Sequence, residues 1–379
     1  MKKIYIFALH LAFGGIEKAI ISMANIFCEK YDVEIICVYN MPDSPAFPLD
    51  ERVKVRYLLD DIPNRDEWKA AIKRRNPVDI IRESFRSVNI LLAKKRELVK
   101  AIKEIEDGVI ITTRHEDNVL LSKFGADNVF KIAQLHHDHK FESLYVDGFK
   151  NKYSRIDTLC MLSPGLRDEV IDMMEGKNEH TKVIYMPNFL EHYPENTGAC
   201  EREKTVLAVG RLNAVKRFDL LINHFIQLHS QFPEWKLRIV GDGEEKEKLE
   251  SILKSYNADD YVVLTGRKDS KGVEEEMLKA SIFAMTSSSE GFPFVLLEAQ
   301  SCALPVVAYD VRIGPGFVIS EGRDGFLAQE GNKEEFNEKM RTLMLSSELR
   351  ENMGKHAVEH AAAFSAEEVS KLWFSLIGE

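Results

Sequence analysis

Two acids eight positions apart mark the segment "SSSEGFPFVLLEAQ" (287–300). Glu290 lies before a glycine, and Pro293 suits the first turn of a helix, where its missing N–H is not needed. The amides of residues 291–294 can then bind an anion at the start of that helix. Glu298 follows about a turn and a half later, and helix side chains lean back towards the N-terminus. The segment therefore predicts a ligand site, whereas a carboxylate with only a structural role is the alternative.

Two cations follow another predicted strand, in "LAVGRLNAVKRFDLLI" (207–222). The strand ends at Gly210, and Arg211 and Lys216 occupy the loop that leads into the next helix. Fixed cations at the carboxyl end of a strand can neutralise a diphosphate. The alternative is a pair of solvated loop charges, and this motif by itself does not decide between the two.

A glycine pair and a histidine cluster follow strands nearer the N-terminus. Gly14 and Gly15 allow the backbone to approach a phosphate or a sugar closely, although a tight turn explains them equally well. The segment "QLHHDHK" (134–140) has the composition of a metal site. Adjacent residues of a strand point to opposite faces, so His136 and His137 cannot easily bind one ion. We therefore predict no metal, and one histidine directed into a site: His136, with His139 as the second candidate.

The elements that position these residues alternate between apolar strands and helices. This pattern predicts an α/β fold with parallel sheets covered by helices on both faces, and ligands at the carboxyl ends of the strands. The polar stretch 189–205 fits a linker, so each half has about six strands of its own. The predicted strands are 3–9, 33–39, 54–58, 109–113, 131–136, 158–163, 205–210, 236–241, 261–266, 281–287, 305–310 and 325–328.

Composition limits the class of protein. The 379 residues are 45% hydrophobic and carry a net charge of −10, which makes nucleic acid an improbable partner. No run of 18 apolar residues occurs, and the N-terminal segment fits a buried strand better than a signal peptide. Five scattered cysteines without a Cys-x-x-Cys pair indicate a reducing cytoplasm and no structural zinc.

Taken together, these motifs resemble the family-4 retaining glycosyltransferases, which have two Rossmann-like domains facing across a cleft, the GT-B fold. The resemblance covers nearly the whole chain, including "MPN" (186–188) and "GRDGFL" (322–327). It implies an N-terminal acceptor domain (1–190), a nucleotide-sugar domain (191–360) and a C-terminal helix (361–379) that packs back on the first domain. The residues that it places at the nucleotide sugar are Gly14, Gly15, Arg211, Lys216, Gly266, Glu290, Gly291, Phe292, Pro293, Phe294 and Glu298.

The resemblance also implies an activity. A hexose would move from a nucleotide sugar, most simply a UDP-sugar, to a bacterial surface glycan, teichoic acid or surface protein, with retention and without a metal or other cofactor. Glu298 would bind the ribose, Arg211 and Lys216 the diphosphate, and Glu290 and His136 the donor sugar. A UDP-sugar 2-epimerase of the same fold and a non-catalytic glycan-binding subunit are the alternatives.

Two departures from the family pattern concern this site. Arg217 replaces the glycine that usually follows the lysine, which leaves the pair of cations intact. Where relatives often have Gly-Pro-Ser-Glu, this chain has Gly-Pro-Gly-Phe (314–317). The loss of that acid leaves the acceptor subgroup open.

Residues 66–103 are basic, with eleven lysines and arginines against five acids. Val78, Ile81, Phe85, Val88 and Leu92 follow a 3,4,3,4 spacing, which is one apolar face of a helix. One interpretation is a helical hairpin whose apolar face packs on the first domain. The other is a surface that docks on anionic lipid, which would make the enzyme a peripheral protein at the inner face of the plasma membrane.

Overall fold

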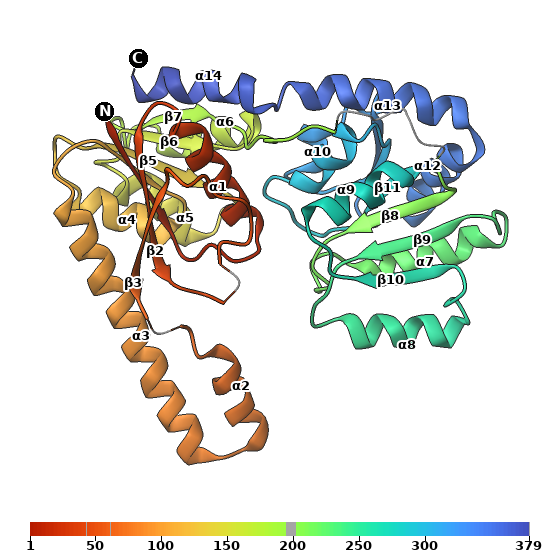
Figure 1. Ribbon diagram of the computed structural model, residues 1–379, viewed down its shortest axis with the longest axis horizontal. Coiled ribbons are helices and arrows are strands. Elements are labelled where there is room, and N and C mark those ends of the chain that lie inside the picture. Colours follow the sequence, from red (N-terminus) through yellow and green to blue (C-terminus); the bar gives the residue numbers. More distant parts are fainter. Residues whose placement is uncertain (43, 61, 195–201, 379) are drawn as a thin grey trace. The chain divides into compact units, whose positions relative to one another are not determined.

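The computed structural model describes residues 1–42, 44–60, 62–194 and 202–378. It divides into two compact units, residues 1–186 with 373–379 and residues 187–372. Each unit is a parallel sheet with helices around it (Figure 1). The predicted α/β fold class is therefore confirmed.

The described residues of the first unit form a seven-stranded parallel sheet in the order β3-β2-β1-β4-β5-β6-β7. The strand order reverses between β1 and β4, and ligands bind outside the carboxyl ends of the strands at such a point. The strands are β1 (Lys3–Ala8), β2 (Asp32–Tyr39), β3 (Lys54–Leu59), β4 (Val109–Thr112), β5 (Phe130–Leu135), β6 (Thr158–Met161) and β7 (Lys182–Tyr185). The helices are α1 (Gly15–Phe27), α2 (Arg65–Arg74), α3 (Pro77–Glu104), α4 (His115–Phe124), α5 (Ser143–Asp147), the π-helix η1 (Gly148–Lys152) and α6 (Pro164–Met174).

The described residues of the second unit form a six-stranded parallel sheet in the order β10-β9-β8-β11-β12-β13, which reverses between β8 and β11. Its strands are β8 (Thr205–Val209), β9 (Lys236–Val240), β10 (Val262–Gly266), β11 (Ile282–Met285), β12 (Val306–Asp310) and β13 (Gly325–Gln329). Its helices are α7 (Phe218–His229), α8 (Lys246–Tyr256), α9 (Ser270–Lys279), α10 (Phe294–Ser301), α11 (Pro315–Val318), α12 (Lys333–Leu345), α13 (Ser347–Ala362) and the start of α14 (Ala366–Ile377). Buried side chains such as Phe225, Trp235 and Phe336 join sheet and helices into one core.

The twelve predicted strands are all present, and β7 was missed. Only four residues long, β7 lies at the edge of its sheet, and its side chains are half-buried or exposed. Strands β4, β6 and β11 are equally short but fully buried, so the missing signal is the continuous apolar run that a partly exposed edge strand does not need. The predicted linker 189–205 falls partly on residues 195–201, which lie outside the described part of the chain.

The end of α14 packs on the first unit. The ring of Trp373 lies 5.4 Å from that of Phe27 on α1, and Lys30 lies 3.9 Å above the ring of Phe374. The burial of Trp373 and Phe27 explains why residues 373–379 belong to the first unit rather than to the second.

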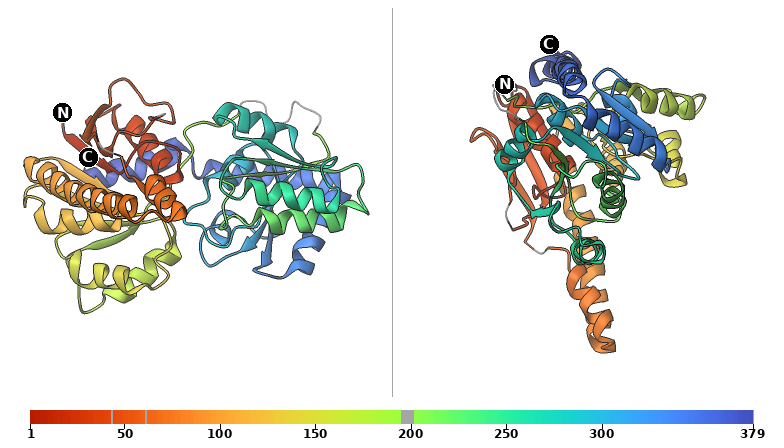
Figure 2. Two further views of the ribbon diagram at one scale, coloured as in Figure 1. Left: turned by 90° about the horizontal axis from the view of Figure 1, so that it is seen from below. Right: turned by 90° about the vertical axis from the view of Figure 1, so that its right-hand side faces the viewer.

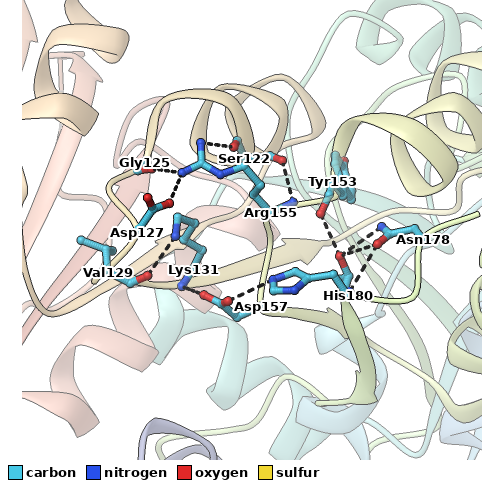
Figure 3. A network of polar contacts seen from close by, with 11 residues as sticks. Ser122, Gly125, Asp127, Val129, Lys131, Tyr153, Arg155, Asp157, Asn178 and His180 are labelled. Atoms are coloured by element: carbon cyan, nitrogen blue, oxygen red, sulfur yellow. Dashed lines mark hydrogen bonds and ion pairs between the residues drawn. The ribbon is translucent and has the colours of Figure 1, made fainter.

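A polar network holds the amino ends of the later strands of the first unit together (Figure 3). Asp157 accepts a hydrogen bond of 2.7 Å from the amide of Lys131, and its other oxygen lies 3.3 Å from His180. Arg155 donates to the carbonyl of Gly125 and pairs with Asp127. These residues come just before β5, β6 and β7 or in the loops that lead to them, which is the edge opposite to the carboxyl ends. We therefore assign the network to the stability of the fold.

The cysteines of the described segments are unpaired and buried: Cys28, Cys37, Cys160 and Cys302. Cys200 lies outside those segments. Among the described helices, none is long and apolar enough to cross a membrane.

Candidate functional site

Three of the predicted residues of the second unit lie in the loops that follow β8 and β11, between which the strand order reverses. The loop after β8 contains Arg211 and Lys216, and the loop after β11 contains Glu290. Two hydrogen bonds join these loops: the amide of Ser288 donates to the carbonyl of Val215 at 2.8 Å, and the Thr286 hydroxyl donates to the carbonyl of Lys216 at 3.1 Å. The loops thus form one surface, although they are about 70 residues apart.

Lys216 crosses this surface to reach Glu290. Its Nζ lies 2.6 Å from Oε1 of Glu290, and both side chains are largely buried, at 21% and 11% exposure. Its stem passes over Gly210, where an added Cβ would lie 3.3 Å from Cε of the lysine. The ammonium is therefore held at a fixed position by an acid that offers a second oxygen for another partner. Arg211, in the same loop, is exposed.

Arg217 supports the loop rather than adding a third cation to the site. Its Nε donates to the carbonyl of Thr286 at 2.9 Å, and its guanidinium also contacts the carbonyl of Ser287 and Glu330. Its backbone is left-handed, with φ of 49°. This left-handed conformation favours glycine, the residue that the family pattern has at this position.

The segment 291–294 leads into α10 as predicted, but the helix begins at Phe294, with Pro293 as its N-cap residue. The amide of Phe294 donates to the carbonyl of Phe292 at 3.0 Å, so it is not available in this arrangement. Among the described residues, no backbone carbonyl accepts from the amide of Gly291 or of Phe292. Because Pro293 has no N–H and that of Phe294 is used, the predicted anion site is reduced to the amides of Gly291 and Phe292.

Aromatic packing fixes the shape of this segment. Phe292 lies 5.6 Å from Phe294 and 5.9 Å from Phe364, and both Phe292 and Phe294 are 8% exposed. Gly314 approaches from the other side with φ of 109°, and an added Cβ there would lie 2.9 Å from Cβ of Glu290. The two phenylalanines therefore position the backbone with their side chains, and only their backbone is presented to a ligand.

Glu298 lies on α10 between Leu297 and Ala299, which are fully buried. Its own side chain is half-buried, so it is more accessible than its apolar neighbours suggested. The position fits a carboxylate that is held by a helix and open on one side.

Glycines at the ends of neighbouring strands let the backbones approach one another closely. The amide of Gly210 donates to the carbonyl of Val240, and the amide of Gly241 donates to that of Gly266, both at 3.0 Å. An added Cβ at Gly241 would collide with the carbonyl of Gly210. Gly266 therefore lies at the same edge of the sheet as Gly210, and its role in binding the nucleotide stays a prediction.

In the first unit, Gly14 is the N-cap residue of α1 and Gly15 is the first residue of that helix. The carboxylate of Glu17 lies directly over Gly14, where a side chain would collide with it. Glu17 is buried and lies 3.8 Å from the guanidinium of Arg114, which follows β4. The glycine pair therefore borders a buried ionic contact at the carboxyl ends of β1 and β4.

His136 follows β5 at the same edge of the first sheet and is 7% exposed. Burial lowers its pKa to about 3, with smaller contributions from His137 and Arg114, so the ring is neutral near pH 7. Nε2 lies 3.3 Å from Oε1 of Gln134, and Nδ1 has no hydrogen-bond partner among the described residues. A neutral ring with one nitrogen unused can hydrogen-bond to an uncharged group such as a sugar hydroxyl.

The other histidines of the cluster have structural partners. His137 lies 2.6 Å from the hydroxyl of Tyr145, and His139, fully buried, lies 3.1 Å from Glu169. Within the described segments, no three His, Cys, Asp or Glu residues come close enough together to hold a metal ion.

Asp117 on α4 was not predicted. It is 1% exposed, and neither carboxylate oxygen has a hydrogen-bond partner among the described residues. Burial raises its pKa to about 6, against the opposing effect of Lys94 and Arg114. Asp117 directly follows Glu116, which is exposed and pairs with Lys94. Nothing in this spacing distinguishes Asp117 as a buried acid, so the sequence analysis could not identify it.

Comparisons with known proteins decide the family. Residues 191–360 match the model of the family described as glycosyl transferases group 1. Residues 191–360 therefore belong to the group 1 glycosyltransferases.

The glycosyltransferase is similar to bacterial enzymes of surface polysaccharide synthesis. It is 29% identical over 97% of its length to an exopolysaccharide phosphotransferase of Streptomyces coelicolor, of which it covers 39%. It is 26% identical to the amylovoran biosynthesis glycosyltransferase AmsD of Erwinia amylovora, and 96% of each chain is covered. Its fold is that of TarM from S. aureus, solved with UDP and alpha-GlcNAc-glycerol, with a TM-score of 0.79 and 15% identity over all of both chains.

The sequence analysis also did not predict a buried polar network that joins α10 to the loop around Asp324 and to α13. In this glycosyltransferase, Gln300 donates to the carbonyl of Val318 at 2.9 Å and to Asp324 at 3.2 Å. Asp324 also accepts from the amide of Ser320 and lies 2.7 Å from His360 on α13. The network fixes α10, and with it Glu298, to the "GRDGFL" loop. That loop was recognised by resemblance, but the partners of Asp324 are distant in sequence.

Proposed function

We propose that the protein transfers a hexose from a UDP-sugar to a bacterial surface glycan, teichoic acid or surface protein, with retention at the anomeric carbon. The observation that carries the proposal is the Lys216–Glu290 pair, 2.6 Å long, at the point where the second sheet reverses. It supplies a fixed cation for phosphate and a free acid oxygen beside it for a sugar hydroxyl.

The nucleotide half of the donor would bind the second unit, within residues 191–360. Glu298 accepts hydrogen bonds from the ribose hydroxyls, and Arg211 and Lys216 bind the diphosphate. The amides of Gly291 and Phe292 contact the phosphate or the sugar, and Gly266 borders the base. UDP in the solved complex of TarM supports the choice of nucleotide.

The chemistry proposed for the step is charge stabilisation. The departing diphosphate gains charge as the glycosidic bond breaks, and fixed cations with helix-end amides stabilise that charge. The acceptor hydroxyl attacks from the face of the leaving group, and a phosphate oxygen takes its proton. Residues 1–190 would provide the acceptor side, with Gly14 and Gly15 near the donor phosphates. Neutral His136, whose Nε2–H donates to Gln134, would accept a hydrogen bond at Nδ1 from a hydroxyl of the donor sugar.

The acceptor class is proposed from the relatives. Two relatives are named for exopolysaccharide and for amylovoran biosynthesis. The alpha-GlcNAc-glycerol in the TarM complex is a glycosylated polyol. These support a polymer rich in hydroxyl groups, either a glycan or a polyol phosphate. The unpaired thiols of the described segments support a reducing compartment, and we propose that the enzyme acts in the cytoplasm.

The test is a panel of UDP-, GDP- and ADP-sugars, each incubated with the enzyme while release of the free nucleotide and formation of new sugar nucleotides are measured. We expect UDP release from one UDP-sugar, faster with acceptor polymer, and slower release in Glu290→Gln. A new UDP-sugar instead of UDP would identify a 2-epimerase. Binding of the polymer without any turnover would identify a glycan-binding subunit.

A further inference from the structure

The apolar row of α3 is exposed, which corrects the interpretation in which this face packs on the first domain. Its five members are between 52% and 70% exposed: Val78, Ile81, Phe85, Val88 and Leu92. The α2–α3 hairpin, drawn in orange, extends beyond the sheet of its unit (Figures 1 and 2). Docking on anionic lipid stays a prediction. Another group of exposed apolar side chains follows β5, at the edge of the sheet where His136 lies.

This other group belongs to residues 140–144, which lead from β5 into α5. All five residues are exposed, and two of them are apolar: Phe141 is 56% exposed and Leu144 is 51% exposed. The segment follows the carboxyl end of β5, and ligands of doubly wound sheets bind outside such ends. Two apolar side chains therefore face solvent on the side of the unit where a substrate is expected.

The backbone of this segment is strained. Lys140 and Phe141 are consecutive residues with left-handed backbones, with φ of 48° and 54°, and neither is a glycine. Residues with side chains rarely adopt this conformation, and where they do, the surrounding structure must hold it. Strain of this kind is common at ligand sites, so it supports a binding role for the exposed ring of Phe141.

Hydrogen bonds and packing fix the base of the segment. The amide of Lys140 donates to Asp138 at 2.9 Å, and the amide of Phe141 donates to Nδ1 of His139 at 3.1 Å. His139 is fully buried, with its Nε2 3.1 Å from Glu169 on α6. Its ring lies 5.0 Å from the ring of Phe141. The buried histidine thus holds both the backbone and the ring of Phe141, so the exposed surface is preformed.

Uncharged polar groups follow this surface in the chain. The hydroxyl of Tyr145, the residue after Leu144, lies 2.6 Å from Nε2 of His137, and both side chains are half-buried. Burial lowers the pKa of His137 and raises the pKa of Tyr145, so the pair is neutral near pH 7. The phenol oxygen can take part in one more hydrogen bond. The segment thus combines an apolar surface with a neutral hydrogen-bonding pair.

We propose that Phe141 and Leu144 form a platform for a pyranose ring of the acceptor. Glu142 and the Tyr145–His137 pair bind the hydroxyls of that ring. One face of a pyranose presents mainly C–H groups, which are attracted to the negative face of an aromatic ring, while its rim carries hydroxyls. The inference rests on the proposed transfer reaction and narrows its acceptor to a glycan made of sugar rings.

Other occupants fit the platform less well. A linear polyol phosphate has no flat apolar face to lie on Phe141. A lipid chain would have to cover Lys140 and Glu142, the exposed charges on either side of Phe141, and taking charges out of water is costly. A sugar ring leaves both charges in water or hydrogen-bonded to its hydroxyls, so it is the occupant that the chemistry of the segment favours.

The test of binding is saturation-transfer NMR of the full chain. The probes are the methyl pyranosides of glucose, galactose, mannose and N-acetylglucosamine, with ribitol and glycerol phosphate as linear probes. We expect transfer to the C–H groups of at least one pyranoside and none to the linear probes. Phe141→Ala should remove it, and Phe141→Trp, which keeps an aromatic ring, should retain it. Phe85→Ala, at a residue 68% exposed on α3, is the matched control and should bind like the wild type.

Kinetics supply a second test, with the UDP-sugar and acceptor polymer that turn over. Phe141→Ala should raise KM for the acceptor up to about tenfold, which is the scale of one aromatic contact. Phe141→Trp should restore the KM, a rescue that a merely structural role of Phe141 would not give. Phe85→Ala again serves as control, and circular dichroism checks that every variant is folded.

Three outcomes would overturn the proposal. Equal saturation transfer in the wild type and Phe141→Ala, or none to any pyranoside, removes the sugar ring as occupant. Transfer to ribitol or glycerol phosphate that depends on Phe141 assigns the platform to a linear polyol. An unchanged KM in Phe141→Ala removes the platform from the acceptor site while the transfer reaction stands. Because the NMR measurement uses no sugar nucleotide, its result is separate from any failure to release UDP.

Discussion

Each unit buries one carboxylate almost completely, but in opposite surroundings. Asp324 of the second unit is 1% exposed and is contacted by Gln300, Ser320 and His360. Asp117 of the first unit is also 1% exposed, and neither of its oxygens has a hydrogen-bond partner among the described residues. A buried charge that lacks partners costs free energy, whereas a network with all its partners holds a structure rigid.

The acid with hydrogen-bond partners thus lies in the unit that we propose binds the nucleotide, and the acid without partners lies in the unit that we propose binds the acceptor. The pair Lys216–Glu290 and the brace of Arg217 belong to the second unit, which is also the part that matches the family model. Both units leave buried polar atoms without partners among the described residues: Nδ1 of His136 and both oxygens of Asp117 in the first, and Oε1 of Gln300 and Oγ of Ser287 in the second. The contrast therefore concerns the two acids rather than the units as a whole. A common nucleotide needs a fixed site, while acceptors that differ between relatives need a surface that can change. The predictions below test this contrast.

The largest effect should come from Lys216→Ala. Its ammonium is held against Glu290 and would face the diphosphate, whose charge grows in the transition state. Removing one such donor lowers kcat by about 10²–10³-fold. Steady-state kinetics should show this loss while calorimetry finds uridine affinity unchanged, and Lys254→Ala on α8 serves as control. Weaker uridine binding would contradict the assignment to the diphosphate.

A smaller effect is expected for Glu298→Ala. A carboxylate that accepts bonds from ribose hydroxyls contributes about 1.5–3 kcal/mol, which is roughly a 10- to 150-fold loss of UDP affinity. Calorimetry with UDP measures it, and Glu250→Ala, a half-buried acid on α8, is the matched control. Unchanged affinity in a folded variant would remove Glu298 from the site.

Glu290→Gln should lower transfer about tenfold and leave UDP affinity intact. The amide oxygen can still accept from Lys216, but the negative charge that strengthens its bond to a sugar hydroxyl is gone. Initial rates and a UDP titration of the same preparation separate the two effects. Near wild-type transfer would show that the acid serves only to hold the lysine.

The sequence predicted the second unit better than the first, for a physical reason. Glu290, Glu298, Arg211 and Lys216 lie in short loops and helix ends whose spacing fixes their geometry. His136 was placed correctly at the end of β5, but its neutral state depends on burial by elements far away in the chain. The partners of Asp324 and the isolation of Asp117 likewise depend on packing between distant segments, which periodicity does not report. The exposed row of α3 shows the same limit, since a spacing of 3,4,3,4 identifies an apolar face but not its partner.

Two substitutions that act on stability rather than on activity, Asp117→Asn and Asp324→Asn, test the comparison between the two acids directly. Burial raises the pKa of Asp117 from 3.8 to about 6, so the folded protein keeps this proton in a range where the unfolded chain has lost it. Stability from this group is therefore present below about pH 4 and is lost as pH rises towards 6. Asparagine carries no charge at any pH, so Asp117→Asn should gain about 1–2 kcal/mol in the free energy of unfolding at neutral pH and nothing at about pH 4.

Asp324→Asn should lower the free energy of unfolding instead. Its amide would turn a donor towards Gln300, Ser320 or His360 and leave buried groups without partners. A loss of about 1–3 kcal/mol at neutral pH is expected. Urea unfolding of both variants and the wild type at the two pH values measures the effects. Because both substitutions exchange the same atoms at residues that are equally buried, side-chain size and intrinsic propensity cancel in the comparison. If the two variants shift stability in the same direction, the paired and unpaired carboxylates do not differ in energy. The first unit would then be as rigidly built around its acid as the second.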